Sequence, residues 1–344
     1  MHFENLKEVV IFGAGSLLND TIKYFKDRNA SIIGIVDNNS KIHGTSVEGI
    51  LISNPSTLAG TSIPVIIASM YSSEIAQQLK NIGVREFYDF SFLFDLHRWK
   101  DHFNRDLMKD SNEKINSVYD LLSDQRSKDV FSSILEYRKS FDPSGLQSAG
   151  YPDYFHPEVS PHPSDTIIDG GAWHGDSALE FVSKLGSGCK IFSFEPEDEN
   201  YQRLQKNIAD HNLKGTVDAI KLGLWSDKMK LHFFQSADFD MQFRIDPTGT
   251  SDISIDVVSI DEFLSENNVR ADFIKMDIEG SEIPALVGAS KTLKEHKPRL
   301  AICAYHQHDD LWEIPLLIKA INPNYKLYMG HHSQNLFETV LYAH

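Results

Sequence analysis

Three acidic residues stand where the ends of neighbouring strands would hold a ligand. Asp169 ends the apolar run 166–169, Glu195 follows the run 190–194, and Asp277 ends the run 271–277. Parallel strands of an open α/β sheet bring their carboxyl ends to one edge, where ligands bind. A carboxylate after the second strand can accept hydrogen bonds from both hydroxyls of a ribose. We therefore predict an adenosine-type ligand beside Glu195, with a solvated strand-end glutamate as the alternative.

A glycine-rich turn follows the first of these strands, in the stretch IIDGGAWHGDSALEF. Gly170, Gly171 and Gly175 lack the side chains that would keep a ligand away from the backbone, although a tight turn without a ligand would use the same residues. Asp169 and Asp176 flank the start of the next helix, where they would repel the pyrophosphate of a dinucleotide. A cationic ligand such as S-adenosylmethionine (SAM) suits these carboxylates better, so we expect SAM here.

Three further residues complete the predicted cofactor site. His174 stands within the glycine-rich turn, and Trp225 and Ser226 follow the strand expected at 217–224. An adenine ring would lie at the edge of the sheet after that third strand, so Trp225 is a candidate for stacking on it. A tryptophan packed in the core is the alternative use of the same side chain.

Asp277, Glu279 and His306 are the candidates for catalysis. The stretch IKMDIEG brings Asp277 and Glu279 to the sheet edge, and His306 follows the strand expected at 299–305. Either His306 or Asp277 could accept the proton of an attacking hydroxyl, which contributes about 10²–10⁴-fold to a rate; helix capping is the alternative role of the acids. With His331 and His332 these side chains also have the ligand types for a divalent metal, but their spacing is not diagnostic and no metal is predicted.

The elements that must position these residues fall into three segments. Residues 1–95 show β-branched runs at 9–12, 32–36 and 65–68 that alternate with helical patterns, which predicts a Rossmann-like α/β domain with a parallel sheet. Residues 96–150 show apolar residues three and four apart, which predicts a helical connector. Residues 151–344 form the last domain, with later strands expected at 217–224, 230–234, 255–260, 271–277, 299–305, 325–329 and 338–343.

The composition of the 344-residue chain narrows the classes of function. Its 49 acidic and 33 basic residues give a formal net charge of −16, which disfavours nucleic acid and anionic membrane surfaces as partners. Its two cysteines can form neither a disulfide framework nor a thiolate metal cage. No apolar window of about 18 residues and no leader-like start are present, so we expect no membrane span and a cytoplasmic protein. Homo-oligomer formation stays open.

At these residues the chain resembles the FkbM family of SAM-dependent methyltransferases. The resemblance rests on IIDGGAWHGDSALEF, IFSFEPEDENYQRLQKNI, IKMDIEGSEIPALVGA and AYHQHDDLWEIPLLIKAIN, which occur in the family's order. It implies a class I, Rossmann-like methyltransferase domain whose turn lies along the methionine part of SAM, at Asp169, Gly171 and Gly175. Glu195 would bind the ribose, and the acidic stretch that starts at Asp277 would face the methyl group. Members of this family methylate hydroxyls of sugars, polysaccharide units and natural products, so a small-molecule or glycan acceptor is expected.

The first segment resembles the small Rossmann-like domains found beside sugar-modifying enzymes of polysaccharide biosynthesis. Its stretch VVIFGAGS contains a GxG turn, and Asp37 follows the second strand, but Leu18 stands where a GxGxxG fingerprint has its third glycine. Ligand binding and a scaffold role are both open for this segment. Two rival functions follow: an NAD(P)-dependent sugar oxidoreductase that uses this turn, or a non-catalytic interaction protein with a nucleotide-type fold. The acidic residues of the last domain argue against the second rival, because packing does not need them.

Overall fold

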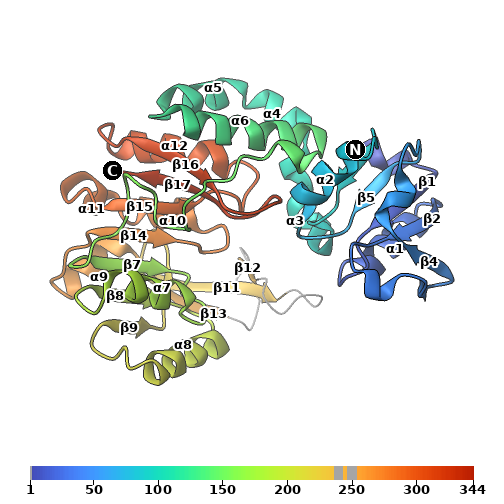
Figure 1. Cartoon of the computed structure of the whole chain (residues 1–344). Coiled ribbons are helices and arrows are strands. Elements are labelled where there is room, and N and C mark those ends of the chain that lie inside the picture. Colours follow the sequence, from blue (N-terminus) through green and yellow to red (C-terminus); the bar gives the residue numbers. More distant parts are fainter. Residues whose placement is uncertain (1, 236–242, 246–253) are drawn as a thin grey trace. The chain divides into compact units, whose positions relative to one another are not determined.

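The computed structural model of the chain describes residues 2–235, 243–245 and 254–344 (Figure 1). The chain divides into two compact units, which are described one at a time. Unit 1 comprises Met1–Tyr119, Gln125–Ala149 and His331–Thr339, and unit 2 comprises Asp120–Asp124, Gly150–Gly330 and Val340–His344. Most of the helical segment 96–150 therefore groups with unit 1. None of the helices in the described ranges has both the length and the apolar character needed to cross a membrane.

Unit 1 is built on a six-stranded sheet of order β3-β4-β2-β1-β5-β6. Its strands are β1 (Glu8–Phe12), β2 (Ser31–Val36), β3 (Ser46–Val47), β4 (Ile50–Ser53), β5 (Val65–Ile67) and β6 (Phe87–Asp89). β3 is antiparallel to β4, whereas β1 pairs in parallel with β2 and β5, β2 with β4, and β5 with β6. The strands predicted at 9–12, 32–36 and 65–68 are β1, β2 and β5, which lie side by side in the sheet.

Helices cover both faces of this sheet. In α1 (Leu18–Lys26), Ile22 belongs to one apolar cluster with Ile11 of β1; in α2 (Ser72–Asn81), Leu79 belongs to another with Phe12 of β1. Because successive side chains of a strand point to opposite faces, α1 and α2 lie on opposite sides of the sheet. The helical segment that follows contains α3 (Leu96–Trp99), α4 (Arg105–Asp110), α5 (Asn112–Leu121) and α6 (Gln125–Ser140).

Unit 2 contains a seven-stranded sheet of order β16-β17-β15-β14-β7-β8-β9 (Figure 1). Its strands are β7 (Thr166–Gly170), β8 (Lys190–Phe194), β9 (Val217–Ile220), β14 (Phe273–Met276), β15 (Arg299–Cys303), β16 (Leu327–His331) and β17 (Thr339–Ala343). The strands from β15 to β9 pair in parallel, and β17 pairs antiparallel with β15. The strand predicted at 325–329 is β16, so His331 lies inside the strand instead of after it.

Helices also cover both faces of this second sheet. They are α7 (Asp176–Leu185), α8 (Asp198–Asp210), α9 (Ile260–Glu266), α10 (Glu282–Val287), α11 (Ser290–Glu295) and α12 (Asp310–Ile321). Phe181 of α7 contacts Phe273 of β14, and Phe263 of α9 contacts Phe192 of β8. In the pairing register, Phe273 and Phe192 lie beside consecutive residues of β7, whose side chains point to opposite faces. The sheet is thus the middle of three layers.

A smaller sheet of order β10-β13-β11-β12 also belongs to unit 2. Its strands are β10 (Gly223–Leu224), β11 (Met229–Gln235), β12 (Phe243–Ile245) and β13 (Ser254–Val258). The prediction of one strand over 217–224 is wrong, because β9 belongs to the large sheet while β10 pairs with β13. The N–H of Leu222 donates to the carbonyl of Ile220 (2.9 Å), which interrupts the extended backbone between the two strands.

The turn after β7 packs against the turn after β14 at the level of the backbone. Gly171 has a φ of +72°, and a β-carbon built on it would lie 1.8 Å from the carbonyl oxygen of Asp277. At Gly170, a β-carbon would lie 2.7 Å from Leu224 Cδ1. No side chain fits at Gly171, so this glycine is required by packing whether or not a ligand binds. The close approach brings the ends of β7 and β14 together.

Replacing Gly171→Ala should destabilise the protein by about 3 kcal/mol or more, because the strain of positive φ adds to the steric collision. Gly186→Ala is the matched control, since Gly186 also has a positive φ (+78°) but nothing lies within 4 Å of its β-carbon position. Urea unfolding of both variants measures the difference. An equal loss of unfolding free energy in the two would contradict the packing argument.

Candidate active site

A deeply buried ion pair joins β14 to β7 in the site. Lys275 Nζ lies 3.2 Å from Asp169 Oδ1, and the two side chains are 2% and 0% exposed. The same Nζ donates to the carbonyl oxygens of Gly170 (3.0 Å) and Gly171 (2.8 Å). Burial alone would lower the pKa of Lys275, but the negative charges of Asp169 and Asp277 outweigh burial and raise the pKa. A positive charge is therefore fixed beneath the glycine-rich turn.

The carboxylate of Asp169 binds neighbouring residues of the fold. Its oxygens accept hydrogen bonds from the hydroxyls of Ser177, in the first turn of α7, at 2.8 Å, and of Ser193, in β8, at 3.0 Å. Together with Lys275 these partners surround the buried carboxylate. The sequence predicts Asp169 at the end of the first strand, where the structure has it, but its carboxylate faces inward. Asp169 thus supports the glycine-rich turn, and its contact with the methionine part of SAM stays a prediction.

Asp277 is the partly accessible carboxylate of the site. It follows β14, its side chain is 26% exposed, and it accepts hydrogen bonds from the hydroxyls of Tyr154 and Tyr305, both at 3.3 Å. Burial alone would raise the pKa of Asp277, but the positive charges of Lys275 and His306 hold the pKa below its usual value. Asp277 is therefore ionised at neutral pH.

His306 lies between carboxylates on both sides of its ring. Its Nε2 is 3.3 Å from Asp277 and 3.9 Å from Glu279, and its Nδ1 is 2.9 Å from Glu282 Oε1. Burial alone would lower the pKa of His306, but the negative charges of Glu282, Glu279 and Asp277 raise it to about 10. The ring is thus protonated at neutral pH. Of the two residues predicted as the base, Asp277 alone is free to accept a proton in this state.

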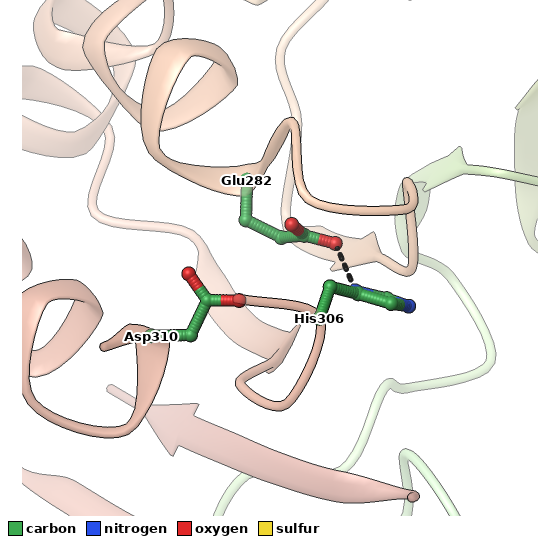
Figure 2. Close-up of side chains that lie close together, drawn as sticks. All are labelled: Glu282, His306 and Asp310. Atoms are coloured by element: carbon green, nitrogen blue, oxygen red, sulfur yellow. Dashed lines mark hydrogen bonds and ion pairs between the residues drawn. The ribbon is translucent and has the colours of Figure 1, made fainter. Parts of the chain in front are cut away.

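Figure 2 shows Glu282, at the start of α10, His306, in the loop after β15, and Asp310, at the start of α12, brought together. One ligand atom from each lies within 4.8 Å of the others, and all three residues are buried. Burial and the negative charge of Glu282 raise the pKa of Asp310 well above its usual value. Carboxylate and imidazole groups can bind divalent metals, and a metal here would replace the proton that His306 Nδ1 donates to Glu282.

The sequence groups His331 and His332 with the possible metal ligands, but in the structure they contact the segment that leads into β17. His331 Nδ1 lies 2.9 Å from Thr339 Oγ1, and the N–H of His332 donates to the carbonyl of Glu338 at 2.9 Å. Within the described part of the chain, the group with metal-ligand geometry shares only His306 with the set considered from the sequence.

Glu195 joins the end of β8 to the glycine-rich turn. Its Oε2 accepts the N–H of Trp173 and its Oε1 accepts the N–H of Glu197, both at 3.0 Å. The N–H groups of Gly171 and Ala172 donate to the carbonyl of Phe194, at 3.1 and 2.9 Å. Burial raises the pKa of Glu195 to about 7. The sheet edge therefore brings Glu195 and the turn together, as the strand-end pattern predicts.

The rest of the turn presents polar and aromatic groups at the start of α7. Gly175 precedes the helix with a φ of +93°, and Asp176 is the exposed first residue of the helix. The ring of His174 lies 3.1 Å from Asn200 Oδ1 of α8 and stacks on the ring of Trp173, which is 43% exposed. His174 is thus held against α8, whereas Asp176 and Trp173 are accessible to a ligand.

Trp225 and Ser226 lie at the smaller sheet. The N–H of Trp225 donates to the carbonyl of Val258 at 3.0 Å, and its ring packs against the cluster that contains Leu231. Ser226 donates its hydroxyl to Asp227 at 2.8 Å. The ring of Trp225 is thus partly buried against this cluster, and its stacking on adenine stays a prediction.

The sequence-based prediction leaves out several residues of the site, among them Lys275, Glu282 and Tyr154. Lys275 lies inside the strand FIKM, and a charged residue in a buried strand is a signal that could have singled it out. Glu282 lies within the stretch DIEGSE, three residues after Glu279, where a role in helix capping is the ordinary interpretation. Tyr154 comes from the turn-rich stretch before β7, which has no periodic pattern that could predict its contact with Asp277.

The pKa of His306 should fall steeply in Glu282→Gln, because burial remains while the nearest negative charge is lost. Glu279→Gln should lower it less, since Glu279 is 60% exposed and its carboxylate lies farther from the ring. In the wild type, the stabilisation from protonated His306 is complete below its unfolded pKa of about 6.5 and is lost as the pH rises through about 10. NMR titration of the imidazole measures each pKa; a wild-type value near that of free histidine would refute the arrangement.

Comparisons with known proteins identify similar sequences and similar folds. Residues 169–332 match the family model described as "Methyltransferase FkbM domain", and residues 5–87 match the model described as "C2185-like, N-terminal". The crystal structure of methyltransferase FkbM from Methylobacillus flagellatus KT superposes with a TM-score of 0.74 at 22% identity, covering 99% of this chain and 90% of that one. This match confirms the predicted α/β fold of the class I methyltransferase type.

Other solved structures match a smaller part of the chain. The O-methyltransferase from Bacillus cereus in complex with SAH has a TM-score of 0.35 at 14% identity and covers 53% of this chain and 74% of that one. Fibrillarin from Aeropyrum pernix has a TM-score of 0.34 at 9% identity, covering 54% and 70%. No curated protein sequence matches the chain. On the family match, residues 169–332 of this chain are a domain of the FkbM methyltransferase family.

Proposed function

We propose that this protein transfers the methyl group of SAM to a hydroxyl oxygen of a small-molecule or glycan acceptor. The observation that carries the proposal is the match of residues 169–332 to the FkbM methyltransferase model. That range includes Lys275, Asp277 and His306, the charged residues whose contacts define the site. The hydroxyl of a sugar as acceptor follows from the resemblance in the motif stretches around Asp169, Asp277 and His306.

The carboxylates at this edge of the sheet fit SAM. Glu195 offers a carboxylate to a ribose diol, and Asp176 offers a negative charge near the start of α7 to an ammonium group. When bound, SAM supplies a methyl group on a positively charged sulfur. The glycines support this fit less than the carboxylates do, because packing against the backbone of Asp277 already requires Gly171.

Asp277 is the residue that we assign to accept the proton of the acceptor hydroxyl. The hydroxyl oxygen forms its bond to the methyl carbon as the carbon–sulfur bond breaks, and the proton passes to a carboxylate oxygen of Asp277. The hydroxyls of Tyr154 and Tyr305 and the protonated ring of His306 hold that carboxylate in place. Because the positive charges of Lys275 and His306 lower the pKa of Asp277, this carboxylate is a weak base, and positioning of the acceptor supplies much of the acceleration.

Glu279 is the second acidic residue of the proposed catalytic set. Its side chain is 60% exposed and 3.9 Å from His306, and its backbone has a φ of +57°. A residue in this left-handed conformation turns the chain sharply between β14 and α10. We assign Glu279 a contact with the acceptor instead of proton transfer, because its side chain is largely exposed, whereas two tyrosine hydroxyls orient the carboxylate of Asp277.

SAM should bind about tenfold more tightly at pH 8 than at about pH 6, because ribose hydroxyls donate to the ionised form of Glu195, whose pKa is about 7 without ligand. Glu195→Gln should weaken binding and remove this pH dependence. Asp176→Asn is the control, which should weaken binding but keep the pH dependence. Titration calorimetry measures the affinities; equal binding by wild type and Glu195→Gln would refute the assignment of Glu195.

Asp277→Asn should lower turnover by about 10²–10⁴-fold, because asparagine cannot accept the proton. Its affinity for SAM should change by less than about threefold. Glu279→Gln is the control and should lose much less turnover. Release of S-adenosylhomocysteine in the presence of nucleotide-linked sugars and oligosaccharides measures the rate. Wild-type turnover in Asp277→Asn would contradict the assignment, because another group would then have to accept the proton.

A further inference from the structure

Unit 1 contains a cavity of about 750 Å³ at the carboxyl edge of its own sheet. Residues that follow β1, β2 and β5 line it, together with the first turns of α2; among them are Gly15, Ser16, Asp37, Tyr71 and Glu74. All of these residues belong to one unit. The cavity therefore exists independently of the site in unit 2.

The position of this cavity follows the topology of the sheet. In the sheet, β2, β4 and β3 lie on one side of β1, and β5 and β6 lie on the other side. The strand order thus reverses between β1 and β5, and residues after both strands line the cavity. Open α/β sheets bind ligands at such a reversal, outside the carboxyl ends of the strands.

The two glycines after β1 serve different purposes. Gly13 has a φ of +117°, and a β-carbon on it would lie 2.4 Å from the carbonyl oxygen of Ala68, so packing requires this glycine. Gly15 has no atom within 4 Å of its β-carbon position and has no positive φ. Neither packing nor backbone strain accounts for Gly15. Its effect is to leave the backbone open at the wall of the cavity.

Backbone N–H groups hold the side chain of Asp37 beside this turn. Its Oδ2 accepts the N–H of Ala14 and its Oδ1 accepts the N–H of Asn39, both at 2.7 Å. These two bonds fix the carboxylate at the end of β2. A carboxylate oxygen can accept more than one hydrogen bond, so Asp37 can also accept from the two hydroxyls of a ribose.

The other lining residues favour a base over a phosphate. Asp37 and Glu74 are acidic, and no lysine or arginine is among the described residues that line the cavity. Tyr71 is 66% exposed and Met70 is 46% exposed at the same place. An exposed aromatic ring beside an exposed thioether offers an apolar surface to a flat heterocycle.

We propose that this cavity binds the nucleoside part of a ligand, with the ribose diol on Asp37 and the base against Tyr71 and Met70. A phosphate on the ribose 2′ oxygen would meet the carboxylate of Asp37, so the ligand has a free diol. Free nucleosides, dinucleotides such as NAD⁺ and nucleotide-linked sugars all carry this chemistry. The proposal does not depend on methyl transfer in unit 2.

The test is binding of adenosine, uridine, NAD⁺, NADP⁺ and UDP-glucose to the full chain, measured by titration calorimetry. We expect at least one probe with a free diol to bind, and NADP⁺ to bind at least about tenfold more weakly than NAD⁺ if the dinucleotide is that probe. Asp37→Asn should weaken binding of that probe by about tenfold or more. The probe that binds most tightly identifies what the nucleoside carries.

Gly15→Val provides a second variant that does not touch the turn's hydrogen bonds. It should fill the cavity wall and weaken binding by about tenfold or more, while its thermal stability stays at the wild-type value. Asp27→Asn, which removes an exposed carboxylate outside the cavity lining, is the control and should bind the probe as the wild type does. Failure of every probe to bind, or binding that survives both Gly15→Val and Asp37→Asn, would overturn the proposal.

Discussion

The buried ammonium of Lys275 is the interaction on which the site in unit 2 depends. It neutralises Asp169, binds the carbonyl oxygens of Gly170 and Gly171, and lowers the pKa of Asp277. One charge thus orients the glycine-rich turn and keeps the accessible carboxylate ionised. Removing one member of a buried ion pair leaves the other uncompensated, which typically costs about 3–5 kcal/mol. A substitution of Lys275 would therefore affect both the conformation of the turn and the ionisation of Asp277.

The strand-end pattern predicted which residues meet, because parallel strands bring their carboxyl ends to one edge. It correctly predicted that Asp169, Glu195 and Asp277 lie at the carboxyl ends of three strands, β7, β8 and β14. It did not predict where each side chain points, because that depends on partners from other elements. Asp169 turns inward to Lys275 and two serines, and Glu282 reaches His306 only after α10 and the loop after β15 pack together. The spacing of apolar residues along the chain does not predict such pairs of side chains.

The two glycine-rich turns show why glycine alone is weak evidence for a ligand. Gly13 in unit 1 and Gly171 in unit 2 both allow a carbonyl oxygen of a neighbouring strand end to approach. A turn of this kind would contain glycine even if nothing bound beside it. Gly15 differs, because no neighbouring atom accounts for its missing side chain. The three-dimensional surroundings of each glycine separate packing from access, which the motif cannot do.

Trp173 gives the turn an optical property of its own. Its indole is 43% exposed and stacks on the ring of His174, whereas Trp99 and Trp312 are buried. The N–H of the same residue donates to Glu195. Light emitted by this indole is therefore sensitive to water and to the neighbouring imidazole at the place where a nucleoside would meet the protein. A ligand that bound at the turn would therefore change the intrinsic fluorescence of the chain, without any attached dye.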